Sequence, residues 1–229
     1  MRATLLTIIA CIGGLTITLR CAGADPLDDV LNRIDAAARQ FKSYSATVKR
    51  LDHDKVLDTD DMIDGTFHLK RGKNGVVGNM DFTEGPDHYV IHLDGGMVEK
   101  YLPKVPVVQV FDIKKYARTM DETMLLGFAV TRQEMEADYT IKLAGTDTID
   151  GMPSAHLILT PKSAEGLKYV KTVELWIPEG KSNPIRQKGT EPSGNYRIAT
   201  YSDVKLNPAL PDSAFELIVP SGTKRVKAN

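Results

Sequence analysis

The spacing of apolar residues changes along the chain, and each spacing predicts a different element. After Asp25 and Pro26, which suit the cap and first turn of a helix, apolar residues recur every three or four positions. This period predicts an amphipathic helix with the apolar stripe Leu27, Val30, Leu31, Ile34, Ala38 and Phe41. From Tyr44 to Lys49 apolar and polar residues alternate instead, which predicts a half-buried strand.

A helical insert divides the strands that follow. Five strands are expected before it, at Thr66–Arg71, Val76–Phe82, His88–Leu93, Met97–Leu102 and Val107–Phe111. Between Ile113 and Met135 the apolar residues return to helical spacing, and Gly127 is expected to interrupt that helix. Five more strands are expected at Tyr139–Leu143, Ala155–Thr160, Val170–Ile177, Pro184–Lys188 and Arg197–Val204, before a last apolar stretch at Ala214–Val219.

Many short strands with one or two helices predict the α+β class, with a mostly antiparallel sheet. Such a sheet curls or closes, and we expect helix to cover its concave face. No linker, low-complexity segment or internal repeat divides the chain. We therefore expect one domain, residues 25–229.

Residues 1–24 have the layout of a cleaved signal peptide. A positive start at Arg2 precedes an almost unbroken apolar run from Ala3 to Leu19, and small residues end the segment at 22–24. The apolar run is shorter than the roughly 20 residues that a membrane-spanning helix needs. Both cysteines, Cys11 and Cys21, lie in this segment, so a lipid-attachment signal is an alternative to a mature chain without cysteine.

Composition and charge exclude several classes of protein. The chain is 42% hydrophobic and 26% charged, values that fit a folded core rather than a disordered chain or a multi-span membrane protein. Lys and Arg total 29 against 30 for Asp and Glu. Because the net charge is near zero and no basic run is present, we expect no binding to nucleic acid.

The sequence contains no pattern that predicts catalysis. None of the five histidines forms a metal-binding pair on a helix, and no nucleophile elbow, phosphate loop or zinc-protease motif occurs. The acidic residues between Asp52 and Asp64 lack the ligand spacing of a calcium loop, so a solvated hairpin is the preferred interpretation. We expect no catalytic residue, no metal and no cofactor.

Arg71 is the unusual position in this pattern. Strand parity that turns Phe67 and Leu69 inward also turns Arg71 inward. A buried guanidinium needs acceptors, such as the carbonyls at the end of a covering helix. The alternative is that the strand ends at Lys70 and Arg71 begins a solvated turn with Gly72.

Four stretches resemble the LolA family of periplasmic lipoprotein carriers and its lipoprotein-sorting relatives. They cover the junction at Phe41–Val48, the strand Gly65–Arg71 with its final lysine–arginine pair, Thr123–Leu126 together with Leu157–Lys162, and the closing segment Leu206–Gly222. The likeness spans nearly all of residues 27–227. The chain differs from the family in having Gly72 where proline is common, and Val76–Gly78 where an aromatic residue is common.

The resemblance implies an incomplete, strongly curved β-barrel whose helices cover an apolar cavity. It implies a monomeric carrier of lipoprotein acyl chains, with an inner-membrane lipoprotein-releasing transporter and an outer-membrane acceptor as partners. It also implies that Arg71 hydrogen-bonds the lid over the empty cavity. Parity and helical stripes then place these residues around the cavity: Phe67, Leu69, Leu31, Ile34, Met124, Leu125 and Phe128.

Two other functions remain open at this stage. One is an envelope sensor or regulator of the same fold that binds a protein partner, and the other is an envelope hydrolase, although no nucleophile–base pattern supports it. A carrier requires a hollow apolar interior with a movable cover, since burying hydrocarbon is worth about 0.8 kcal/mol per methylene.

Overall fold

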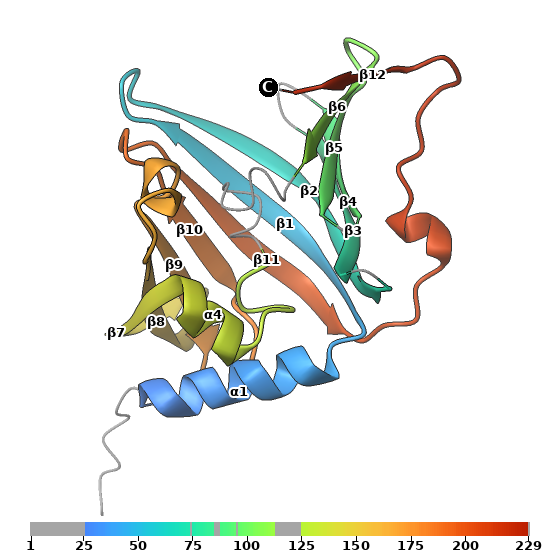
Figure 1. Ribbon diagram of the computed structural model, residues 1–229. Helices are drawn as coiled ribbons and strands as arrows, with labels where there is room; N and C mark the ends of the chain where they lie inside the picture. The colour runs from blue at the N-terminus through green and yellow to red at the C-terminus, as the bar shows by residue number, and fades with distance from the viewer. Residues whose placement is uncertain (1–25, 74, 85–87, 95, 113–124, 229) are drawn as a thin grey trace, which may run out of the picture.

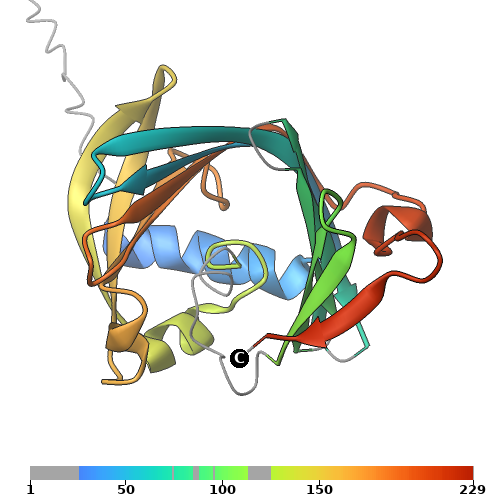
Figure 2. The same ribbon diagram turned by 90° about the horizontal axis from the view of Figure 1, so that it is seen from above.

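The computed structural model describes residues 26–73, 75–84, 88–94, 96–112 and 125–228. The signal-peptide prediction and Met124 lie outside these residues. Within them the chain forms one sheet of twelve strands, ordered β12-β6-β5-β4-β3-β2-β1-β11-β10-β9-β8-β7. The sheet curls around an interior without closing, and α1 (Leu27–Gln40) lies across that interior (Figures 1 and 2). The expected α+β class with an incomplete, mostly antiparallel barrel is confirmed.

The sheet has two halves, which meet where β1 pairs with β11. The first half contains β1 (Ser43–Asp54), β2 (Thr59–Gly72), β3 (Gly75–Glu84), β4 (Tyr89–Asp94), β5 (Met97–Leu102) and β6 (Val107–Asp112). The second half contains β7 (Tyr139–Ile149), β8 (Met152–Pro161), β9 (Thr172–Pro178), β10 (Arg186–Thr190) and β11 (Tyr196–Leu206). All neighbouring strands are antiparallel except β12 (Lys224–Lys227), which pairs parallel to β6.

Helix α1 buries the stripe that its sequence predicts. Val30, Leu31, Ile34 and Ala38 are at most 1% exposed, and they face the sheet. Asp28 and Asp29 lie in the first turn and Arg39 in the last, which suits the helix dipole.

The acidic segment forms the arms of a long β1–β2 hairpin, as the pattern suggests. Asp52 pairs with Arg50 at 2.6 Å, Asp60 with His53 at 2.8 Å and Asp64 with Lys49 at 3.7 Å. Three of the hairpin's acidic side chains therefore have partners on β1.

Of the expected helical segment 113–135, the described residues confirm the interruption at Gly127, and they are helical only from Arg132 onward. Residues 125–129 form turns, and the helix α4 spans only Arg132–Asp138. Gly127 has φ +81°, a conformation that breaks a helix, and Thr131 starts a new one through a capping box with Glu134.

The C-terminal segment crosses the outer face of the first half of the sheet (Figure 1). Its short 3₁₀ turn η2 (Asp212–Phe215) buries Phe215, and the buried Asn79 amide donates to the carbonyls of Ala214 and Glu216 at 3.3 and 2.8 Å. The segment then adds β12 to the edge of β6. The sequence pattern predicts an apolar stretch here but no strand.

Candidate functional site

The concave interior contains two apolar clusters, one on each half of the sheet. The first includes Phe67, Leu69, Met80 and Phe82. The second joins Leu31 and Ile34 of α1 to apolar residues of β8 and β9. Two walls that face one interior provide the geometry for enclosing an apolar guest.

The segment Leu125–Val130, which we call the plug, lies between these walls. Phe128 belongs to the first cluster and Leu126 to the second, and they are 1% and 3% exposed. The backbone bonds that its described residues make are local, from the N–H groups of Phe128 and Ala129 to the carbonyl of Leu125. The plug therefore fills the interior without being a strand of the sheet.

Buried polar side chains of the second half hold the plug in place. The Gln187 amide donates to the carbonyl of Leu126 at 2.6 Å, and the Asn183 amide donates to the carbonyl of Gly127 at 2.9 Å. The Tyr201 hydroxyl donates to Oε1 of Gln187 at 2.7 Å, which directs the NH₂ group of that amide toward the plug. We call these three side chains the latch.

The ring of Phe128 occupies an aromatic slot. Its centroid lies 4.6 Å from that of Tyr44, 5.2 Å from Tyr201 and 5.8 Å from Phe67. Burial raises the pKa of the Tyr44 and Tyr201 hydroxyls further above neutral pH, so both remain hydrogen-bond donors. The Tyr44 hydroxyl is fully buried and has no hydrogen-bond partner among the described residues.

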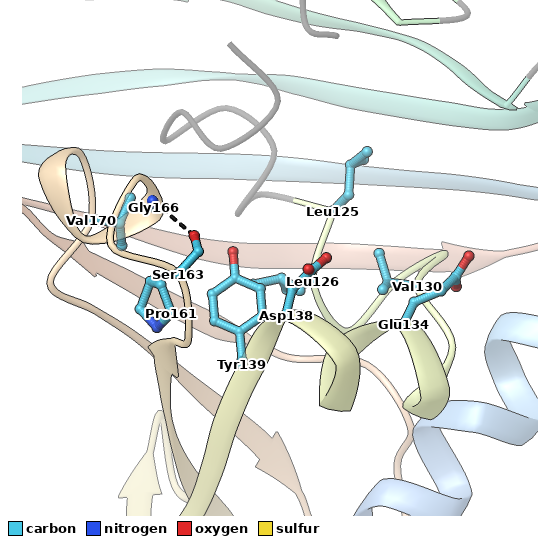
Figure 3. A pocket seen from close by; sticks show the side chains of 10 residues that line it. All are labelled: Leu125, Leu126, Val130, Glu134, Asp138, Tyr139, Pro161, Ser163, Gly166 and Val170. Carbon is cyan, nitrogen blue, oxygen red and sulfur yellow. Dashed lines mark hydrogen bonds between the residues drawn. The ribbon is translucent and has the colours of Figure 1, made fainter. Parts of the chain in front are cut away.

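Cavities adjoin the plug on two sides. One, of about 210 Å³, lies between plug residues Leu125, Leu126 and Val130 and the loop that carries η1 (Gly166–Lys168), as Figure 3 shows. A second, of about 340 Å³, lies under α1, where Phe128 and Asn183 form part of its wall. The plug therefore contributes to the walls of both cavities.

Arg71 lies near the end of β2. It binds carbonyls at a helix end, as the inward-facing interpretation requires, and it is also exposed, as the turn interpretation requires. Its guanidinium donates to the carbonyl of Ala38 at 2.9 Å and to that of Phe41 at 3.1 Å, at the C-terminal end of α1. These two acceptors belong to α1 and its exit, not to the plug, so a role of Arg71 in closing a lid stays a prediction.

The structure brings most of the predicted cavity residues to the interior. Phe67 and Leu69 are fully buried on the first wall, Leu31 and Ile34 on the second, and Leu125 is partly buried beside the plug's own Phe128. The latch residues Asn183, Gln187 and Tyr201 were missed by the sequence analysis. Gln187 lies between two basic residues, so no local pattern marks it as buried.

Two further properties of the described residues concern membrane spans and metal ions. None of the helices described has both the length and the apolar character needed to cross a bilayer. In the described ranges, no three His, Cys, Asp or Glu side chains gather as ligands for a metal ion.

The curled sheet with a helix across its interior is shared with solved proteins. An uncharacterised conserved protein from Thermus thermophilus matches with a TM-score of 0.56 at 10% identity, over 88% of this chain and 98% of its own. At this identity the match shows a common fold and nothing of function.

Two further solved structures match less well. A LolA superfamily protein from Nitrosomonas europaea has a TM-score of 0.41 at 16% identity, over 85% of this chain and 99% of its own. MucB, in the MucA/MucB complex of Pseudomonas aeruginosa, has a TM-score of 0.46 at 14% identity, over 82% of this chain and 60% of its own. No protein-family model matches the chain, and no curated protein sequence matches it.

Proposed function

We propose that this protein is a periplasmic carrier that takes the acyl chains of lipoproteins, or of a similar amphiphile, into its concave interior. The observation that carries the proposal is the plug, a non-strand segment that fills the space between two apolar walls and has a cavity on two sides. The sequence resemblance supports a lipoprotein cargo and partners in the inner and outer membranes.

The physical basis of such a carrier is competition for one apolar space. Acyl chains left in water gain about 0.8 kcal/mol for each methylene that they bury. Phe128 and Leu126 occupy the space in the empty protein, so cargo must displace them. Binding and release then depend on the small difference in free energy between the interior filled by the plug and the interior filled by cargo.

The test is to weigh what the protein carries. Native mass spectrometry of the protein extracted gently from the cell envelope should show an added mass that fragments to acyl chains. The purified protein should also bind a pyrene-labelled diacyl phospholipid in a one-to-one complex. A protein that carries no lipid and binds none, or that copurifies with a stable protein partner instead, would contradict the proposal.

Arg71→Leu should leave lipid loading intact but slow transfer to acceptor vesicles about tenfold. The lost bonds to Ala38 and Phe41 stabilise the empty state, and a charged hydrogen bond contributes about 1.5 kcal/mol or more. Transfer can be followed by pyrene fluorescence. Lys73→Leu, which removes an exposed cation two residues away, serves as the matched control. Unchanged transfer by Arg71→Leu would show that the α1 contact does not favour release.

A further inference from the structure

The plug offers the latch two consecutive backbone carbonyls. The carbonyl of Leu126 accepts from Gln187 and that of Gly127 accepts from Asn183, and both amide side chains are more than nine-tenths buried. Next to these carbonyls, the ring of Phe128 fills an apolar slot. The plug therefore presents a pair of polar acceptors joined to a buried apolar group.

An acylated lipid has the same arrangement. Each of its ester or amide carbonyls is an acceptor directly attached to a hydrocarbon chain. We propose that Gln187 and Asn183 donate to the acyl carbonyls of the cargo once the plug has moved, so that the interior selects lipids with carbonyl-linked chains. This inference rests on the proposed carrier function and narrows its substrate class to acyl esters and amides.

Unused hydrogen-bonding capacity in the same place supports the inference independently. The Tyr44 hydroxyl, which can donate a hydrogen bond, is buried and has no partner among the described residues. Buried polar groups in native proteins are nearly always paired, and an unpaired one calls for a reason. Tyr44 lies against Phe128, so a guest that replaces this ring would contact Tyr44, whose unpaired hydroxyl can donate to it.

The chemistry of the latch explains why a guest without carbonyls should bind less well. When the plug leaves, the amide NH₂ groups of Gln187 and Asn183 lose their acceptors in a space shielded from water. A pure hydrocarbon has no acceptor, and the ether oxygens of an ether lipid are weaker acceptors than carbonyls; leaving a buried donor unpaired or poorly paired is costly. A diacyl lipid restores both bonds.

The test compares two phospholipids that share headgroup and chain length, one with ester-linked and one with ether-linked chains. Each competes with a pyrene-labelled fatty acid for the wild-type protein, and the ratio of the two affinities is measured. We expect the ester lipid to bind about a hundredfold more tightly, about tenfold for each of the two hydrogen bonds to a buried donor. Gln187→Leu and Asn183→Leu should each lower this ratio about tenfold, since each variant removes one of the two donors.

The ratio is the decisive measurement, because a latch variant also frees the plug and changes the affinity for both lipids. Gln133→Leu on the exposed face of α4 is the control and should keep the wild-type ratio. Equal wild-type affinities for the two lipids would overturn carbonyl selection while leaving the carrier function standing. A ratio unchanged in both latch variants would overturn the assignment to these residues, and binding of neither lipid would overturn the carrier function itself.

Discussion

Replacing Phe128 with alanine is expected to destabilise the empty protein and, at the same time, to tighten its binding of lipid. The ring is 1% exposed and contacts three other aromatic rings, so its loss should lower the free energy of unfolding by about 3 kcal/mol. If the ring competes with cargo, its removal should also raise the affinity for a pyrene-labelled diacyl lipid about tenfold.

The opposite signs of these two effects distinguish a plug from an ordinary core residue. Phe82→Ala is the matched control, since Phe82 is fully buried in the same cluster but belongs to β3. It should lose a similar amount of stability in urea without gaining lipid affinity. A Phe128→Ala protein whose affinity falls together with its stability would show that Phe128 supports the binding wall rather than occupying the site.

The helix and the strands could be predicted from the sequence because the spacing of their apolar residues matches the face that each element buries. The stripe of α1 and the alternation of β2 both place their apolar residues on the buried side, including Ile34, Phe67 and Leu69. A resemblance in short motifs added the curvature of the sheet, which no local period contains.

The plug could not be predicted in the same way. Leu125, Leu126 and Phe128 have the spacing of a helical stripe, but each packs against a wall formed by distant strands. The backbone of Gly127 bends at φ +81°, where a Cβ atom would lie 2.8 Å from Pro184. Tertiary packing and this one glycine therefore override the local helical period.

The latch and β12 could not be predicted for a related reason. Gln187 lies between two basic residues in β10, so it resembles a solvated position until the plug supplies its partner. All residues of β12 are exposed, and that strand exists through its pairing with β6. In both places the determining contact comes from a segment far away in sequence, which a local pattern does not contain.

The backbones of β2 and β3 approach closely at Gly65, beside an irregularity in their pairing. The pairing of β2 with β3 shifts register between Asp64 and Gly65, the mark of a β-bulge, and bulges bend and twist strands. A Cβ atom at Gly65 would lie 2.3 Å from the backbone oxygen of Asp81 and 3.0 Å from the Cα of Phe82. Because these atoms belong to the backbone, the two strands themselves would have to separate.

Gly65→Ala should therefore lower the free energy of unfolding by about 3 kcal/mol, and it should weaken lipid binding even in the fraction that folds. The single tryptophan, Trp176, lies on the opposite half of the sheet and reports urea unfolding by fluorescence. Thr66→Ala, an exposed neighbour, should change stability by no more than about 0.5 kcal/mol. If Gly65→Ala unfolds at the same urea concentration as the wild type, β2 and β3 can separate without a loss of stability. The bulge then does not determine how the first wall faces the plug.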